Sequence, residues 1–114
     1  MRALVLLFLT STLALTAASC EKIEVAGGTP KCIEKEIREF NQTSSCDDAS
    51  VSEYWFQNKT VFTFEPGTCG ADMATPVYDA KCNRLGSLGG IQGNTKINGE
   101  DFSNAEFVRV VWEK

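Results

Sequence analysis

The residue whose setting predicts the most specific chemistry in this chain is Cys20, which lies where an apolar leader gives way to polar sequence. Arg2 supplies a positive charge at the start, residues 3–15 are predominantly apolar, and small residues at 16–19 lead up to the cysteine. A charged start, a short apolar core and small residues before the cleavage point are typical of a secretory signal peptide. We therefore predict a signal peptide over residues 1–19.

A cysteine directly after such small residues is typical of bacterial lipoprotein signals, and it predicts that the Cys20 thiol is acylated, for example with palmitate. The processed chain would then be exported and held by its lipid in the cell envelope, on the periplasmic or the outer surface of a membrane. Residues 20–28 end in two glycines and are predicted to form a flexible tether, which spans roughly 30 Å when extended. Residues 29–114 are predicted to form a single small domain, because a segment of this length supports one hydrophobic core and not two.

Four further cysteines, Cys32, Cys46, Cys69 and Cys82, form an even set once Cys20 carries lipid. We expect two disulfides, because exported chains usually oxidise their cysteines and a small domain gains about 2–4 kcal/mol from each bond. Four cysteines allow three connectivities, and the alternative to bonding is a set of buried free thiols. The short loops that it closes favour the pairing Cys32–Cys46 with Cys69–Cys82.

Catalytic and metal-binding residue patterns are weak in this sequence. The chain contains no histidine, which removes the Ser-His and Cys-His nucleophile pairs. No two cysteines form a CxxC motif, which argues against a zinc site and against a redox-active dithiol. Glu53 and Glu65 lie among aromatic residues and are the pair that a glycosidase would use, but charged residues on strand faces are mostly solvated. We therefore predict a protein that is not an enzyme and has no metal or cofactor.

Charge and motif content argue against a nucleic-acid partner. Loss of Arg2 with the leader shifts the formal net charge from −4 to −5, because all the acidic residues lie beyond the leader. An acidic domain repels nucleic acids and anionic lipid surfaces. The glycine-rich stretch near residue 90 also lacks the spacing of a P-loop or a dinucleotide-binding motif.

Helical spacing of apolar residues predicts one amphipathic helix over residues 30–41. Its apolar face carries four residues, which are Cys32, Ile33, Ile37 and Phe40. Thr29 is the expected N-cap and Pro30 the expected first helical residue.

Four short segments rich in β-branched and aromatic residues predict strands at 51–57, 60–64, 76–78 and 107–112. The last segment is apolar on both faces, which is typical of a strand in the centre of a sheet. Five glycines within residues 86–99 predict a long loop around Ile91. The predicted fold is α+β, with one amphipathic helix packed on an antiparallel sheet of about four strands and braced by disulfides.

The first two strands are predicted to form a hairpin with Asn58-Lys59 as a two-residue turn. This register places Trp55 opposite Phe62 on one face, and Tyr54 and Phe56 on the other face. Because both faces carry large apolar groups, the helix can cover only one of them. The other face needs a loop or a partner.

Several motifs recur in a fixed order along the chain: Cys32-Ile33 followed by Ile37, then 54–57, 61–66, Val77-Tyr78-Asp79 with Cys82-Asn83, 89–93 and Val110-Val111-Trp112. Their order resembles that of a family of small bacterial cell-envelope proteins known only as a domain of unknown function. The resemblance covers nearly all of the processed chain and implies an exported or lipid-anchored envelope protein, without supplying an activity. It also implies that related chains carry a further cysteine pair where this chain has Gly86 and Ile97, so that a third disulfide is absent here.

Aromatic residues on both faces of the hairpin predict an exposed interaction patch, and long ordered loops often carry binding function. The candidate interaction residues are Tyr54, Trp55, Phe56, Gly89, Gly90 and Ile91. The leading hypothesis is a lipid-anchored envelope domain that binds an envelope protein or a surface glycan. The alternative is a secreted, disulfide-braced inhibitor that presents residues 86–99 to a hydrolase.

Overall fold

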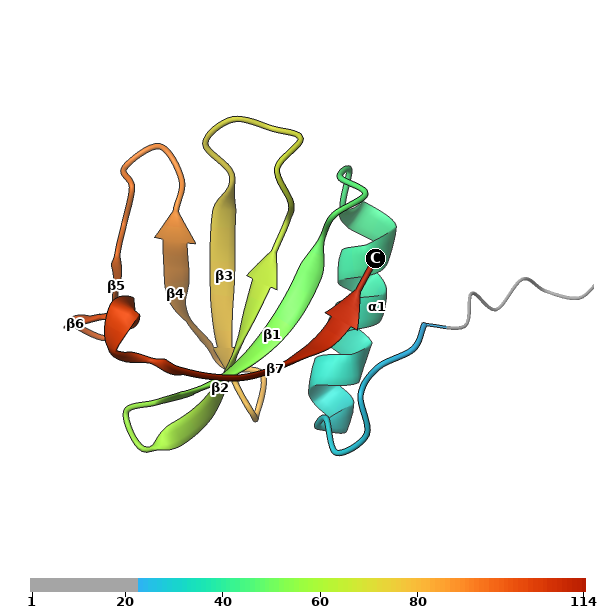
Figure 1. Ribbon diagram of the computed structural model, residues 1–114, viewed down its shortest axis with the longest axis horizontal. Helices are drawn as coiled ribbons and strands as arrows, with labels where there is room; N and C mark the ends of the chain where they lie inside the picture. The colour runs from blue at the N-terminus through green and yellow to red at the C-terminus, as the bar shows by residue number, and fades with distance from the viewer. Residues whose placement is uncertain (1–22) are drawn as a thin grey trace, which may run out of the picture.

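The computed structural model describes residues 23–114, which form one long helix, a five-stranded antiparallel sheet and a smaller two-stranded sheet (Figure 1). This arrangement confirms the predicted α+β class, with one more strand in the main sheet than expected. No helix within this range is long and apolar enough to cross a membrane. The predicted signal peptide and the predicted acylation of Cys20 lie outside the described residues.

Helix α1 (Lys31–Thr43) is the predicted amphipathic helix, and it packs on one face of the sheet. Ile33 and Ile37 are fully buried in that contact. The helix ends two residues later than predicted, where the backbone N–H of Ser44 donates to the carbonyl of Phe40 at 2.8 Å.

The main sheet has the strand order β4-β3-β2-β1-β7. Its strands are β1 (Ser50–Phe56), β2 (Lys59–Glu65), β3 (Ala74–Asp79), β4 (Arg84–Gly89) and β7 (Glu106–Glu113). The expectation that the last strand lies in the centre of the sheet is wrong. Strands β1 to β4 form a meander of neighbouring antiparallel pairs, so the last strand joins at the free side of β1 and becomes an edge.

The β1–β2 turn lies one residue earlier than predicted. Gln57 and Asn58 form it, with φ values of 52° and 61°, as a type I′ turn requires. The ladder consequently pairs Trp55 with Thr60 instead of Phe62. Each pairing moves by two residues, so every side chain keeps the face on which the sequence placed it.

Each face of the sheet carries its own apolar cluster. The cluster under α1 contains Ile33, Ile37, Ala49, Val51, Phe62, Phe64, Val111 and Trp112. The cluster on the opposite face contains Phe56, Val61, Val77 and Ile97, and it is covered by side chains from residues 85–105. The chain itself therefore supplies a cover for much of the second face.

Residues 86–99 do not form the long loop that their glycines predicted. Most of the first part belongs to β4, and the remainder makes a turn and the short strand β5 (Lys96–Ile97), which pairs with β6 (Glu100–Asp101). A Cβ atom at Gly86 would lie 3.1 Å from Cδ1 of Ile97. The two positions that the family resemblance connects by a disulfide are therefore neighbours across the second cluster.

The four remaining cysteines form two disulfides, as expected, but in another pairing: Cys32–Cys82 and Cys46–Cys69. The predicted partners Cys32 and Cys46 lie at opposite ends of α1, roughly 20 Å apart at 1.5 Å per residue, whereas a disulfide needs Cα atoms within about 7 Å. Cys69 and Cys82 are likewise separated by the length of β3. The bonds that form tie the start of the helix to the β3–β4 turn, and the segment after the helix to the β2–β3 connection.

The segment that precedes the helix packs on the domain from Ile23 onward. Ile23, Val25 and Ala26 contact the cluster under α1, and the Ala26 N–H donates to the carbonyl of Val111 at 2.8 Å. The predicted N-cap role of Thr29 is wrong, because its hydroxyl donates to the carbonyl of Ala26 at 2.7 Å while Pro30 occupies the cap position. Residues 23–28 thus lie against the body of the protein and do not extend away from it.

Candidate functional site

Strand β7 presents an exposed apolar edge between Glu106 and Val110, which we call the β7 edge. Three of its side chains are unusually open for apolar residues: Phe107 is 58% exposed, Val108 50% and Val110 41%. Its ladder with β1 shifts register twice, which leaves Val108 and Val111 as bulge residues without a partner on β1. The bulge at Val108 brings Phe107 and Val110 to the same face of the sheet, opposite Tyr54 and Ser52 respectively.

A row of aromatic rings leads from this edge across the second face of the sheet. The Phe107 ring meets Tyr54 edge-on at 5.5 Å between centroids, and Tyr54 meets Phe102 in the same way at 5.2 Å. Phe102 then packs on Phe56 at 5.0 Å. We call these four residues the aromatic row; its inner end is buried at Phe56 and its outer end is exposed at Phe107.

An open pocket of about 490 Å³ lies beside the aromatic row. Its lining comprises Tyr54, Leu88, Asn94, Thr95, Asp101, Phe102, Ser103 and Ala105. Ala105 directly precedes Glu106, so the pocket adjoins the beginning of β7. Half of these lining residues are apolar or aromatic and half are polar, and the pocket is shallow and open to solvent.

The polar groups of the pocket have different roles. The Asn94 side chain is engaged within the turn, where its Nδ2 donates to the carbonyls of Ser87 at 2.7 Å and Lys96 at 2.9 Å. Asp101 accepts from the backbone N–H of Ser103 at 2.9 Å, and this bond holds the pKa of its carboxyl below the usual value. Burial, with a smaller contribution from the charge of Glu65, raises the pKa of Tyr54, so its hydroxyl is protonated at neutral pH. The pocket therefore offers one carboxylate and one neutral phenol to a ligand.

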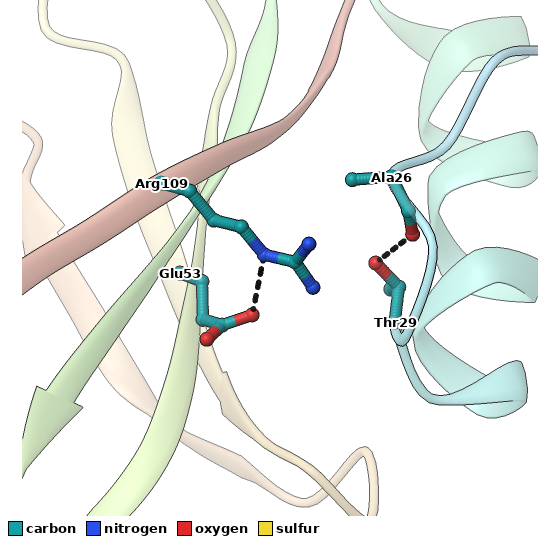
Figure 2. A network of polar contacts seen from close by, with 4 residues as sticks. All are labelled: Ala26, Thr29, Glu53 and Arg109. Carbon is teal, nitrogen blue, oxygen red and sulfur yellow. Dashed lines mark hydrogen bonds and ion pairs between the residues drawn. The ribbon is translucent and has the colours of Figure 1, made fainter.

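The face under α1 has a different polar feature near β7. Figure 2 shows the Arg109 guanidinium reaching from β7 over β1, where its Nε lies 3.2 Å from Oε1 of Glu53. The same guanidinium points toward the turn of Ala26 and Thr29, and a Cβ at Gly28 would lie 3.5 Å from its terminal nitrogen. The ion pair thus joins β1 and β7 beneath the N-terminal turn.

The sequence-predicted interaction residues divide between three places. Tyr54 and Phe56 belong to the aromatic row, although Phe56 is buried. Trp55 is 45% exposed on the opposite face, where it pairs with Glu106 across the β1–β7 ladder.

The glycine-rich turn forms the third place. Gly89 and Asn94 hydrogen-bond to each other through both backbone groups, at 2.8 and 3.1 Å, and close a turn that contains Gly90. Ile91 projects from this turn and is 89% exposed. Leu88 and Asn94 at the base of the turn line the pocket, so the turn and Tyr54 meet at one site.

Sequence reasoning missed the partly buried Phe102 and the exposed Phe107 and Val110. The apolar run at 107–112 was visible, but apolarity alone does not separate a central strand from an exposed edge. Phe102 had no periodic pattern around it because it lies in a single 3₁₀ turn, η1 (Phe102–Asn104).

The acidic residues with shifted pKa values serve turns. Both oxygens of Asp48 accept from Thr68, and these bonds lower the pKa of the Asp48 carboxyl. Partial burial would raise the pKa of Asp79, but hydrogen bonds from Asn83 and from the Lys81 N–H outweigh it and lower the pKa. Within residues 23–114, no group of three or more His, Cys, Asp or Glu residues is arranged to hold a metal ion.

A comparison with protein families matches residues 36–114 to a family described as Domain of unknown function (DUF6970). The chain belongs to the DUF6970 family. This confirms the predicted membership of a family of unknown function, and the matched region includes the whole sheet, the aromatic row and the pocket. No match was found among curated proteins or among solved structures.

Proposed function

We propose that this DUF6970 protein is an exported, lipid-anchored domain of the cell envelope that acts by binding a partner and not by catalysis. The observation that carries the proposal is the exposed apolar β7 edge, continuous through Tyr54 with a pocket of about 490 Å³. Exposed aromatic and aliphatic residues beside a pocket are typical of interaction sites.

The cysteines support the envelope location. Two disulfides occupy Cys32, Cys82, Cys46 and Cys69, and stable disulfides form mainly outside the reducing cytosol. Cys20 is the one cysteine left over, and it follows a leader typical of exported lipoproteins. Its acylation accounts for the odd cysteine count.

The state of the carboxyl groups supports a binding role. A carboxyl that acts as general acid near neutral pH needs a raised pKa. Each aspartate with a shifted pKa in residues 23–114 has it lowered, and Glu53 is paired with Arg109. Glu65 accepts a hydrogen bond from the hydroxyl of Ser50 at 3.2 Å at the exposed end of β2.

Metabolic labelling with an alkynyl fatty acid tests the anchor. The wild type and a Glu21→Ala control should be labelled and Cys20→Ala should not, because only the thiol at position 20 is expected to accept lipid. Equal labelling of Cys20→Ala and the wild type would contradict the anchor.

Cross-linking in intact cells tests the binding role. The full chain should retain one dominant envelope component, which Phe107→Ala loses and the distant control Lys59→Ala keeps. Phe107 is exposed, so its truncation should leave the fold intact, which circular dichroism can check. Retention of the same component by Phe107→Ala would contradict the assignment of function to this surface.

The second candidate is an inhibitor that presents the glycine-rich turn to a hydrolase. The observation that favours it is Ile91, which is 89% exposed on a turn closed by the Gly89–Asn94 hydrogen bonds. Incubation with a panel of proteases should then give stoichiometric loss of one activity, and Ile91→Ala should abolish it. No loss of activity across the panel would remove this candidate.

A further inference from the structure

The two edges of the main sheet differ in how the chain protects them. Strand β4 forms one edge, and at its end Gly89 exchanges backbone hydrogen bonds with Asn94, while β5 packs alongside. Edge strands expose unpaired N–H and C=O groups, and proteins often cover such edges with their own loops. The β4 edge is covered in this way.

The β7 edge lacks such a cover. Within the described part of the chain, the one backbone hydrogen bond to the outer side of β7 comes from Ala26 to Val111, beyond Val110. A bulge at Val108 and the charged residues Glu106 and Arg109 interrupt this edge, but residues 106–110 contain neither proline nor lysine, which are further common devices that prevent strand pairing. The backbone groups of residues 106–110 that point away from β1 therefore have no backbone partner among residues 23–114 and are open to an added strand.

The side chains along this edge define what an added strand would carry. Phe107 and Val110 lie on the face of the aromatic row and are open to solvent, so residues placed over them must be apolar. The pocket at Ala105 continues that face past the start of β7 and can receive one further apolar side chain. Main-chain bonds would supply affinity, and alternate side chains would supply specificity.

The charge of Glu106 indicates which residue an added strand would carry on the other face of the sheet. Glu106 is exposed, has no ion-pair partner among residues 23–114, and lies opposite the exposed ring of Trp55. A lysine or arginine beside Glu106 would complete a cross-strand ion pair. Arg109, in contrast, is already paired with Glu53 and does not call for an acidic residue.

The same charges argue against a second copy of this chain as the occupant. An antiparallel pair centred on Val108 would set Glu106 against Val110, and one centred on Phe107 would set Glu106 against Val108. A pair centred on Arg109 would place the two arginines opposite each other. None of these registers satisfies Glu106, and a register that sets Glu106 against Arg109 would draw the arginine away from Glu53, so a heterologous strand fits better.

We propose that the β7 edge binds an extended segment of a partner protein as an additional strand, with apolar residues over Phe107 and Val110 and a basic residue beside Glu106. The inference rests on the proposed binding function and names the partner class and the binding mode. It does not depend on the lipid anchor.

A peptide titration tests this proposal with the intact purified protein. The probe is a capped peptide of about ten residues that alternates isoleucine with threonine and has one central lysine. One matched peptide replaces the lysine with glutamate. Another replaces the isoleucine next to the lysine with proline, which cannot donate a ladder hydrogen bond. Backbone amide shifts and amide hydrogen exchange report binding residue by residue.

We expect the lysine peptide to protect amides within residues 106–110 and the proline peptide to protect none. Glu106→Lys should lower the affinity for the lysine peptide by about fivefold or more, because an opposite-charge pair becomes a like-charge pair. It should raise the affinity for the glutamate peptide, because there a like-charge pair becomes an opposite-charge pair. This reversal of preference distinguishes specific binding at the β7 edge from non-specific hydrophobic binding. A misfolded variant would not bind the glutamate peptide better than the wild type does.

Four outcomes would overturn the proposal. The first three are amide protection that does not map to residues 106–110, no change in the binding of either peptide on Glu106→Lys, and self-association of the wild type that Glu106→Lys removes. The fourth is a shift of the Tyr54 and Phe107 signals on addition of soluble envelope glycans when no peptide has any effect. If cross-linking in cells still captures a component elsewhere on the surface, the proposed function stands while the strand-addition mode fails.

Discussion

At the residue scale, the least expected group in the core is the hydroxyl of Thr63. Thr63 lies in the middle of β2 and is 2% exposed, and its Oγ1 has no hydrogen-bond partner within residues 23–114. A buried hydroxyl without a partner costs about 1–3 kcal/mol. The sequence shows a threonine suited to a strand, but only the packing reveals that its hydroxyl is unsatisfied.

Replacing this hydroxyl by a methyl group should stabilise the protein. We expect Thr63→Val to raise the free energy of unfolding by about 1 kcal/mol, because the side-chain shape is kept and the unsatisfied group is removed. Urea unfolding followed by circular dichroism measures the change, and the half-exposed Thr60→Val on the same strand should shift it by less than about 0.5 kcal/mol. A loss of stability in Thr63→Val would mean that the hydroxyl is hydrogen-bonded.

Asp79 controls the turn between β3 and β4 through its charge. Its two oxygens accept from the N–H groups of Lys81 and Asn83, each at 2.9 Å, and from the Asn83 side chain at 3.0 Å. These hydrogen bonds hold the folded-state pKa of the Asp79 carboxyl below its usual value, so the stabilisation is fully present above the unfolded-state pKa and disappears as pH falls through the folded-state pKa.

Removal of this carboxyl should therefore make the free energy of unfolding depend less on pH in the acidic range. We expect Asp79→Ala to lower the free energy of unfolding by about 1 kcal/mol at pH 7, and the stabilities of variant and wild type to converge as pH falls through the folded-state pKa of Asp79. Thermal unfolding across pH 2 to 7 gives both curves, with Asp47→Ala as a control. Parallel curves over the whole range would show that the charge of Asp79 is not what holds the turn.

At the element scale, the two disulfides hold the helix to the sheet at both of its ends. Cys32–Cys82 joins the first turn of α1 to the β3–β4 turn and spans 50 residues of sequence. Cys46–Cys69 joins the segment after α1 to the β2–β3 connection and spans 23 residues. The helix and strands β1, β2, β3 and β7 could be predicted from local patterns, whereas this disulfide pairing could not, because it depends on which element ends meet in space.

The longer loop should make Cys32–Cys82 the more stabilising bond. The loop-entropy relation gives about 4 kcal/mol for it and about 3.5 kcal/mol for Cys46–Cys69. Double alanine variants of each pair, compared by urea unfolding under oxidising conditions, should show this order. The reverse order would indicate that packing around the cystines outweighs chain entropy.

At the scale of the whole molecule, the packed N-terminal segment limits how far the domain can lie from a bilayer. If Cys20 is acylated as proposed, only Glu21 and Lys22 separate it from Ile23, which already contacts the core. The three residue-to-residue steps from Cys20 to Ile23 span at most about 10 Å, compared with roughly 30 Å for the tether that the sequence predicted over residues 20–28.

The domain should therefore lie against the membrane surface. Neutron reflectometry on a supported bilayer that carries the acylated protein should place the protein layer within about 10 Å of the headgroups. Insertion of twelve Gly/Ser residues after Cys20 should open a hydrated gap below the protein. A gap of similar width in the wild type would mean that residues 23–28 detach from the core.

The sequence by itself determined one helix and four of the five strands of the main sheet. It predicted the amphipathic helix, the β1–β2 hairpin with apolar residues on both faces, the α+β class and the presence of two disulfides, because these follow from the types and spacing of neighbouring residues. It also identified Tyr54, which lines the pocket, and the glycine turn, whose neighbouring residues Leu88 and Asn94 line the same pocket.

Only the tertiary structure decided which cysteines pair and that β7 is an exposed edge. It also decided that residues 84–105 fold back over the second face of the sheet. Each of these features depends on distances between residues far apart in the chain, and a local pattern of apolar residues is the same whether a strand is flanked on both sides or on one. The physical reason is that side-chain type fixes what a segment can bury, while the arrangement of the other elements fixes what it does bury.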